Sequence, residues 1–345
     1  MIRVLSLGVL LWLAAGASLA KTVLVAGHGT DSGICGTSAA PCRSISQAIA
    51  NAVDGDTISV GPGYYGDLDR DGVWGEPGEE LGLDNATCSC VVELSKRVTL
   101  ISKDGAASTV IDADGDDLDV IAVLASGAGS KIGKAGHGFT LRNSGEFGFS
   151  AQLVPHLDVE GNVAEHNAAD GFNVRSDGMI SRQNRAIENG DDGFTFVGAG
   201  GTSTGDVAIG NFDRGFVVEG SDNHLTGAVS IANRQGFIVS LTSGPTRIDK
   251  SAALGNQNEG VVISDGVNLT LTSMSIVGND AVSGNNCGVT NNSALTIHAT
   301  KSWWGAATGP GALPANLACN PVPGSVTDTS GFLKKELHVL AKPLR

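Results

Sequence analysis

The stretch IENGDDGFTF, residues 187–196, has a close copy on each side. EHNAADGFNV (residues 165–174) precedes it and IGNFDRGFVV (residues 209–218) follows it. In all three, an Asn is followed four residues later by Gly and then Phe, and the copies begin 22 residues apart. A fixed period of this length is the sequence signature of a solenoid built from stacked coils.

Three columns of residues keep this period over much of the chain. Gly followed by an apolar residue recurs at spacings of 23, 22, 22, 21, 24 and 28 residues, at Gly148, Gly171, Gly193, Gly215, Gly236, Gly260 and Gly288. Asn recurs with the same period, at Asn143, Asn167, Asn189, Asn211, Asn233, Asn256 and Asn279. A bulky aliphatic residue stands two positions before five of these Asn, at Ile187, Ile209, Ile231, Leu254 and Val277.

The copies predict short strands and not helices. None has the apolar run at three- and four-residue spacing that a helix needs. Pairs such as Phe194 and Phe196 instead alternate with other residues, as they do in a strand. Coils of about 22 residues with two or three short strands each, stacked on one another, form a parallel β-helix. The predicted fold class is therefore all-β, a single-stranded solenoid.

The columns also predict how the coils stack. Phe172, Phe194, Phe216 and Phe237 are expected to form an interior aromatic stack, and the aliphatic residues a second interior column. The Asn side chains would hydrogen-bond from coil to coil at a tight turn, where the Gly would supply a positive φ. One outward column becomes apolar along the solenoid, which indicates either a face covered by a loop or a binding strip. Its members are Asn173, Thr195, Val217, Ile238 and Val262.

Residues 1–20, MIRVLSLGVLLWLAAGASLA, have the pattern of a secretory signal peptide, with an Arg before an apolar run and small residues at the end. We expect cleavage after Ala20 and a soluble mature protein, secreted or periplasmic, because no second apolar run is long enough to span a membrane. The formal charge of −14 argues against nucleic acid or an anionic membrane as a partner.

Six cysteines in an exported chain indicate disulfides. We expect pairing within three neighbourhoods, although six cysteines allow 15 connectivities. The neighbourhoods are Cys35 with Cys42, Cys88 with Cys90, and Cys287 with Cys319. The pair in CSC needs a local turn, because two residues of extended chain separate their α-carbons by nearly 7 Å.

The two ends of the solenoid need covers. In SISQAIANAVDGD (residues 44–56), Ser44 and Gln47 have capping-box spacing, and an apolar face follows, which predicts a short amphipathic helix over the first coil. The segment 31–65 that contains it closely resembles the amino-terminal entry of secreted bacterial right-handed parallel β-helix proteins of the pectin-lyase-like superfamily. ATKSWWGAATGPG (residues 299–311) resembles the segment that closes many of them.

The resemblance implies a right-handed β-helix with a short N-terminal capping helix, over nearly the whole mature chain. Its expected parts are a signal peptide (1–20) and one β-helix domain (21–345). Within the domain we expect a cap and first coil (21–60), regular coils (138–300) and a closing segment (301–345). The superfamily contains lyases, hydrolases, epimerases, copper-delivery proteins and members with no known activity, so the resemblance leaves the activity open.

The motif DLDRDG (residues 67–72) matches the first half of a calcium loop. Asp67, Asp69 and Asp71 would supply side-chain ligands and Val73 its carbonyl oxygen. The loop departs from the pattern at position twelve, which is Gly78, with Glu79 and Glu80 just after it. The closing carboxylate would therefore come from a loop of altered length, ending at Glu79, or from Glu76. We expect a calcium ion here, and the alternative is a solvated acidic loop.

Acidic and basic residues in the central coils give a candidate catalytic site: Arg175, Asp191, Asp192, Asp213 and Arg214. Polysaccharide lyases of the superfamily use several acidic residues to hold calcium against a uronate, with Arg or Lys as base. In register, however, the positions before the repeated Gly vary among Ala, Asp, Arg, Asn and Glu, which is typical of a solvated turn.

Two functions fit these observations. The first is a non-catalytic exported β-helix that binds a glycan or a protein at the cell surface, which the variable turn positions favour. The alternative is a calcium-dependent polysaccharide lyase or related enzyme acting on an acidic polysaccharide. The expected partner is an extracellular or cell-wall polysaccharide.

Overall fold

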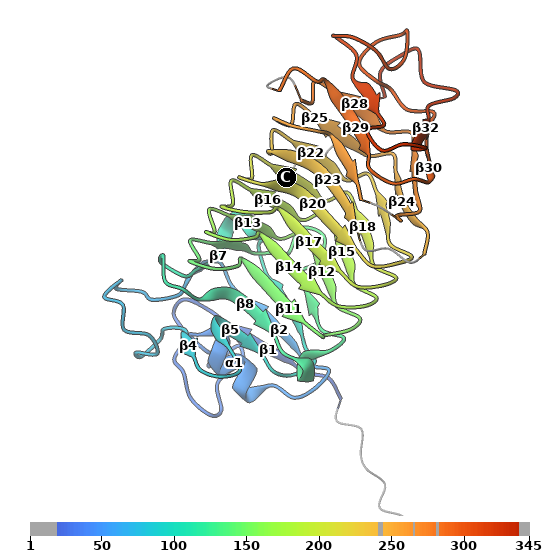
Figure 1. The fold of residues 1–345 in the computed structure, drawn as a ribbon. Coiled ribbons are helices and arrows are strands. Elements are labelled where there is room, and N and C mark those ends of the chain that lie inside the picture. Colours follow the sequence, from blue (N-terminus) through green and yellow to red (C-terminus); the bar gives the residue numbers. More distant parts are fainter. Residues whose placement is uncertain (1–18, 241–243, 265, 281–282, 338–345) are drawn as a thin grey trace, which may run out of the picture.

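The computed structural model describes residues 19–240, 244–264, 266–280 and 283–337. Most of the predicted signal peptide therefore lies outside the described residues. Three long sheets wind along one axis as a parallel β-helix, with the N-terminal coils at one end and the C-terminal coils at the other (Figure 1). Through the central coils, each coil contributes one strand to each sheet, so neighbours within a sheet are three strands apart in sequence.

Sheet A contains β1 (Thr22–Val25), β2 (Thr57–Val60), β6 (Thr99–Ser102), β9 (Lys131–Ile132), β12 (Asp158–Glu160), β15 (Ile180–Arg182), β18 (Thr202–Thr204), β21 (His224–Thr226), β24 (Thr246–Asp249), β27 (Leu269–Thr272), β30 (Thr296–Thr300) and β32 (Val326–Asp328). Sheet B contains β3 (Gly63–Tyr65), β7 (Thr109–Asp112), β10 (Thr140–Arg142), β13 (Val163–Glu165), β16 (Arg185–Ile187), β19 (Val207–Ile209), β22 (Val229–Ile231), β25 (Ala252–Leu254) and β28 (Ser275–Val277).

Sheet C contains β4 (Leu83–Asp84), β5 (Ser89–Leu94), β8 (Asp119–Val123), β11 (Phe149–Gln152), β14 (Phe172–Arg175), β17 (Phe194–Val197), β20 (Arg214–Glu219), β23 (Gln235–Ser240), β26 (Val261–Ile263), β29 (Cys287–Asn291) and β31 (Leu317–Cys319). The helical elements are α1 (Ile45–Asn51) and the short 3₁₀ turns η1 (Ala106–Ser108) and η2 (Ala125–Gly127). Within the described residues, β4 and β5 are the antiparallel pair and the other pairings are parallel.

The predicted aromatic stack is confirmed on the inner face of sheet C. Phe172, Phe194, Phe216 and Phe237 are register partners in successive strands. Their rings stack with centroids 4.9 Å apart and interplanar angles of 4°, 7° and 8°. Because 4.7–4.9 Å is the spacing of hydrogen-bonded strands, the rings repeat at the spacing of the backbone itself.

The predicted Asn ladder is also confirmed, at the turn between sheets B and C. Asn211 illustrates it: its Oδ1 accepts hydrogen bonds from the backbone N–H and the Nδ2 of Asn189, and its own Nδ2 donates to Asn233 at 2.9 Å. The ladder runs through Asn167, Asn189, Asn211, Asn233, Asn256, Asn279 and Asn316. The prediction that Asn143 begins the ladder was wrong. Ser144 occupies that position, and the side chain of Asn143 instead donates to Asp112.

The predicted interior aliphatic column was wrong. In β16, the side chain of Ala186 is fully buried and Ile187 is only half-buried, on the outer face of sheet B. The reason is the residue before each ladder Asn from Asn167 to Asn279, such as Glu188 with φ of 52°, whose left-handed conformation shifts the alternation of side chains. The aliphatic side chains pack in an outer cluster formed by Val207, Ile209, Val229, Ile231, Ala252 and Leu254.

The reason predicted for the recurrent Gly was wrong as well. Gly193 is not among the residues with positive φ. A Cβ at this position would lie 2.8 Å from the Nδ2 of Asn211 and 2.9 Å from the Cβ of Ala208. The repeat therefore requires Gly because the Asn ladder and the inner Ala column leave no room for a side chain.

A second ladder, which the sequence repeat did not reveal, lies at the turn before sheet B. The backbone N–H of Asn162 donates to Asn184 at 3.0 Å, and that of Asn184 donates to Asp206 at 2.8 Å. Asp206 is thus a carboxylate in a position that Asn fills in the two preceding coils. Burial raises its pKa to about 6.

Replacing Asp206 with Asn is expected to stabilise the protein at alkaline pH. The pKa is raised in the folded state, so the contribution of Asp206 is present below about pH 4 and is lost as the pH rises through about 6. Asp206→Asn should raise the free energy of unfolding by up to about 3 kcal/mol at pH 8 and leave it unchanged near pH 4. Denaturant unfolding at both pH values measures this, and an effect independent of pH would contradict it.

The two ends are closed as the sequence predicts. Helix α1 is capped by Ser44, whose hydroxyl accepts the N–H of Gln47 at 3.1 Å, and Ile45 and Ile49 are buried beneath it. At the other end, Trp304 is fully buried.

The three predicted disulfides are present: Cys35–Cys42, Cys88–Cys90 and Cys287–Cys319. Among the described residues, no helix has the length and apolar character needed to cross a bilayer.

Candidate functional site

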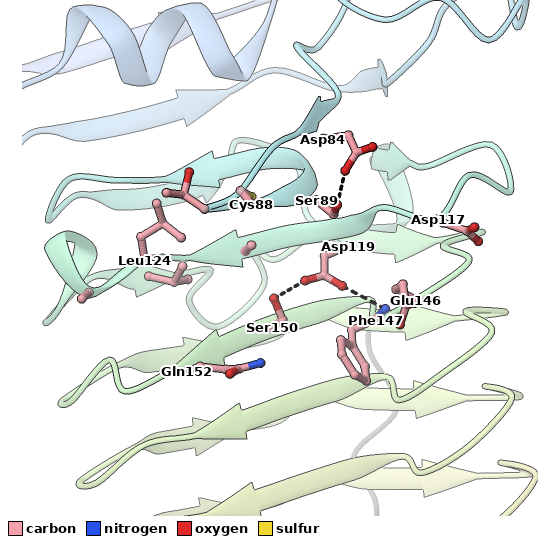
Figure 2. A pocket seen from close by; sticks show the side chains of 14 residues that line it. Asp84, Cys88, Ser89, Asp117, Asp119, Leu124, Glu146, Phe147, Ser150 and Gln152 are labelled. Atoms are coloured by element: carbon pink, nitrogen blue, oxygen red, sulfur yellow. Dashed lines mark hydrogen bonds between the residues drawn. The ribbon is translucent and has the colours of Figure 1, made fainter.

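A groove of about 650 Å³ lies on the outer face of sheet C, over its N-terminal strands (Figure 2). Strands β5, β8 and β11 and the turns beside them provide the floor and the walls. The side chains that reach into it are polar or acidic for the most part, and Phe147 adds one aromatic ring. The lining residues include Asp84, Ser89, Asp117, Asp119, Glu146, Phe147, Ser150 and Gln152.

Asp119 lies in the middle of this groove. Its carboxylate accepts hydrogen bonds from the hydroxyl of Ser150 and from the backbone N–H of Phe147, the latter at 3.2 Å (Figure 2). Burial raises the pKa of Asp119 to about 6, against the effect of these hydrogen bonds. Carboxyl groups with raised pKa values cluster at functional sites.

The short hairpin of β4 and β5 forms one wall of the groove. Asp84 of β4 accepts a hydrogen bond from the hydroxyl of Ser89 at 2.6 Å (Figure 2). The Cys88–Cys90 disulfide constrains the turn. The predicted local turn is present, since the backbone N–H of Asn85 donates to the carbonyl of Cys88. Because β4 and β5 are antiparallel, this wall does not belong to the repeat.

Further along sheet C, three carboxylates meet at the turns before β14 and β17. Asp170, Asp191 and Asp192 each place an oxygen within 4.8 Å of the other two. Asp170 accepts the backbone N–H of Asp192 at 3.1 Å and the Nδ2 of Asn173 at 2.7 Å. Burial, and then the charge of Asp170, raise the pKa of Asp192 to about 7. A bound cation would offset the repulsion that this shift records.

The predicted arginines flank this acidic cluster. Arg214 donates toward Asp192 at 3.4 Å and pairs with Asp213 at 3.3 Å. Arg175 donates to Asn173 at 3.1 Å and so joins the same network. The structure thus brings the five residues predicted as catalytic into one network, in which Arg175 is joined through Asn173 and Asp213 through Arg214.

Asp213, the fifth, faces two arginines and is not in the three-carboxylate group. Besides Arg214, it pairs with Arg234 at 3.2 Å. Asp213 therefore does not share a carboxylate group with Asp191, and Asp170 lies beside Asp191 instead.

Sequence reasoning missed Asp119 and Asp170 as site residues. Asp170 stands two residues before Phe172, as Asp192 stands before Phe194 and Asp119 before Ile121. Phe172 pairs with Phe194 and Phe149 with Ile121, so these acids lie along one edge of sheet C. The sequence therefore held a signal for these acids, because each stands two residues before an interior residue of sheet C.

The residues predicted to bind calcium lie in the segment between β3 and β4. Asp67, Asp69 and Asp71 each have a carboxylate oxygen within 4.8 Å of the other two. Asp69 makes a second group of the same kind with Glu76 and Glu79. A role for the carbonyl of Val73 stays a prediction.

The comparisons with known proteins identify the fold. The sequence matches no family model and no curated protein. Among solved structures, the chain is similar to the pectate lyase Pel9A, with a TM-score of 0.59 and 18% identity, over 90% of this chain and 79% of that one. It is also similar to the catalytic unit of a thermostable GH87 α-1,3-glucanase from Streptomyces thermodiastaticus strain HF3-3, with a TM-score of 0.51 and 12% identity, over 84% of this chain and 65% of that one. The chain therefore has the fold of these proteins, a right-handed parallel β-helix.

Proposed function

We propose that this is an exported protein that binds an extracellular polysaccharide along the outer face of sheet C. The observation that carries the proposal is the groove of about 650 Å³, which is open to solvent and lined by hydrogen-bonding side chains from several coils. A stack of parallel strands presents such side chains at a regular spacing, which suits a polymer with a repeating unit. Both of the similar solved structures are, by name, polysaccharide-cleaving proteins.

The charge of the groove indicates which polysaccharides it would accept. Asp84, Asp117, Asp119 and Glu146 line it, and none of the described lining residues is Lys, Arg or His. Carboxylates accept hydrogen bonds from sugar hydroxyls but repel uronates at close range. The proposed ligand is therefore a hydroxyl-rich neutral glycan, or an acidic one whose charges are bridged by a divalent cation. Phe147 offers a ring face for a sugar to pack against.

A screen of polymers tests the proposal. The mature protein would be run in native gels cast with neutral and acidic polysaccharides, with calcium or with a chelator. We expect at least one polymer to retard it relative to a reference protein of similar charge. Free migration with every polymer, in both conditions, would contradict polysaccharide binding.

A second candidate function is calcium-dependent cleavage of an acidic polysaccharide, which the group of Asp170, Asp191 and Asp192 favours. An ion held there would neutralise a uronate carboxylate and acidify the adjacent C5–H. A base would take that proton while the C4–O bond breaks and the leaving sugar receives a proton. Arg214 is held by two carboxylates and Arg175 by one amide, so Arg175 is the better candidate for the base.

If the protein is a lyase, Asp191→Ala should reduce its rate at least about 100-fold, because the side chain is exposed and would act on the ion and not on the fold. The absorbance of the unsaturated uronate product measures this on pectate, alginate and glycosaminoglycans with calcium. Asp177→Asn, another exposed acidic position, is the control. Activity that survives Asp191→Ala would remove the site assignment, and no product from any polymer would leave binding as the function.

A further inference from the structure

The segment of residues 67–79 carries an unusual density of negative charge. It contains Asp67, Asp69, Asp71, Glu76 and Glu79 against a single basic residue, Arg70. Arg70 does not enter the acidic group, since its guanidinium pairs with Asp114 at 3.6 Å and lies over the ring of Tyr64. The five carboxylates therefore repel one another without an internal counter-ion.

These carboxylates converge on Asp69. An oxygen of Asp69 lies within 4.8 Å of oxygens of Asp67 and Asp71, and Asp69 also forms a group of the same size with Glu76 and Glu79. The turn is fixed from within, because Asp67 accepts the N–H groups of Arg70 and Gly72 at 2.7 and 2.8 Å. The acidic side chains from both ends of the segment thus form two groups that share Asp69.

Glu79 gives an independent indication that a ligand belongs there. Its side chain is only 6% exposed, and its Oε1 accepts the N–H of Leu68 at 2.7 Å. Its Oε2 is buried and has no hydrogen-bond partner among the described residues. An ionised oxygen that is buried without a partner is costly. A cation in contact with Oε2 and the neighbouring carboxylates would remove that cost.

We propose that residues 67–79 form a structural calcium site, with carboxylate ligands from Asp67, Asp69, Asp71, Glu76 and Glu79 and the carbonyl of Val73. The donors are all oxygens, and Ca²⁺ takes six to eight of them, whereas Zn²⁺ prefers His and Cys. Position twelve of the loop is Gly78, and Glu79 takes the role of the closing carboxylate one residue later. The site is separate from the groove and from the acidic cluster of the central coils, and it does not depend on the proposed function.

The ion would fasten the N-terminal cap. The next residue, Glu80, is buried at the start of α1, where its carboxylate accepts the N–H groups of Ile45 and Ser46 at 2.6 and 2.8 Å and the hydroxyl of Ser46. Trp74, in the same segment, donates to Asp116 of the next coil at 2.7 Å. Ordering residues 67–79 therefore holds together the cap helix and the first coils.

Calcium and terbium titrations of the mature protein test this site. Calcium should raise the melting temperature by roughly 5 °C at 100 times its dissociation constant. Tb³⁺, a calcium substitute, should show emission sensitised by Trp74 and displaced by calcium. Asp69→Asn with Glu79→Gln should weaken calcium binding at least tenfold and abolish this emission. If the double variant does not fold, Glu79→Gln alone replaces it in the titrations. A Gln side chain can still accept the hydrogen bond from the N–H of Leu68.

Asp191→Asn is the matched control, because it alters the other acidic cluster and should leave the Trp74-sensitised emission unchanged. Unchanged calcium affinity in a folded Glu79→Gln or double variant would overturn the proposal. So would the absence of binding at about 5 mM calcium, above the roughly 10⁻³ M limit of extracellular calcium modules. Neither result bears on polysaccharide binding by the groove.

Discussion

Replacing Phe194 with Ala is expected to lower the free energy of unfolding by about 3–5 kcal/mol. The ring is fully buried and stacks on both Phe172 and Phe216 at 4.9 Å. Truncation removes the buried apolar surface and both stacking contacts, and the flanking coils cannot close the cavity because their spacing is set by strand hydrogen bonds.

Denaturant unfolding followed by circular dichroism measures this loss. Phe212→Ala is the control, since Phe212 belongs to the next copy of the repeat but is 75% exposed. Its truncation should change stability by less than about 0.5 kcal/mol. Equal effects of the two substitutions would contradict an interior stack.

Replacing Asn211 with Ala is expected to cost about 3 kcal/mol or more. The substitution leaves the N–H of Asn189 without its acceptor, and it removes the donors to the carbonyl of Ala186 and to the side chain of Asn233. All of these groups are buried, so water cannot replace the lost bonds.

Asn258→Ala is the comparison for this effect, because Asn258 lies in an equivalent turn two residues after the ladder residue Asn256. It should be close to neutral. Hydrogen exchange should also show faster exchange at Asn189 in Asn211→Ala, and protection as in the unchanged protein would argue against the ladder as a stabilising element.

The sequence predicted the fold because the repeat makes local patterns and tertiary contacts coincide. Phe194 and Phe216 are neighbours in space because they are equivalent in sequence, and the same holds for Asn189 and Asn211. The capping helix and the disulfides were predicted for a different reason, namely that Ser44 with Gln47 and Cys35 with Cys42 are local in the chain.

The direction in which each side chain points was less predictable. Ile187 and Ala186 are adjacent, and only the left-handed residue Glu188 decides which of them faces the interior. Gly193 was correctly placed in a column, but the contact that excludes a side chain comes from Asn211 and Ala208 of the next coil. Such contacts are steric consequences of stacking, and residue types alone do not reveal them.

The groove could not be predicted from the repeat because part of it lies outside the repeat. Asp84 and Ser89 belong to an antiparallel hairpin, and Asp119 to a coil whose interior residue is Ile121 instead of Phe. Two members of the acidic cluster, Asp191 and Asp192, were predicted because they are adjacent in sequence. Asp170 was not, because it joins them only through the stacking of coils.

Two Phe variants test most directly whether polysaccharide binds in the groove on sheet C. Their affinities would be measured for a polymer that retards the protein in the native gel. Phe147 lines the groove, whereas Phe212 is exposed and does not line it. Loss of a ring packed on a sugar is worth about 1.4 kcal/mol, so Phe147→Ala should raise the dissociation constant about tenfold. Phe212→Ala should leave it unchanged. Equal affinity of both variants and the unchanged protein would contradict binding in this groove.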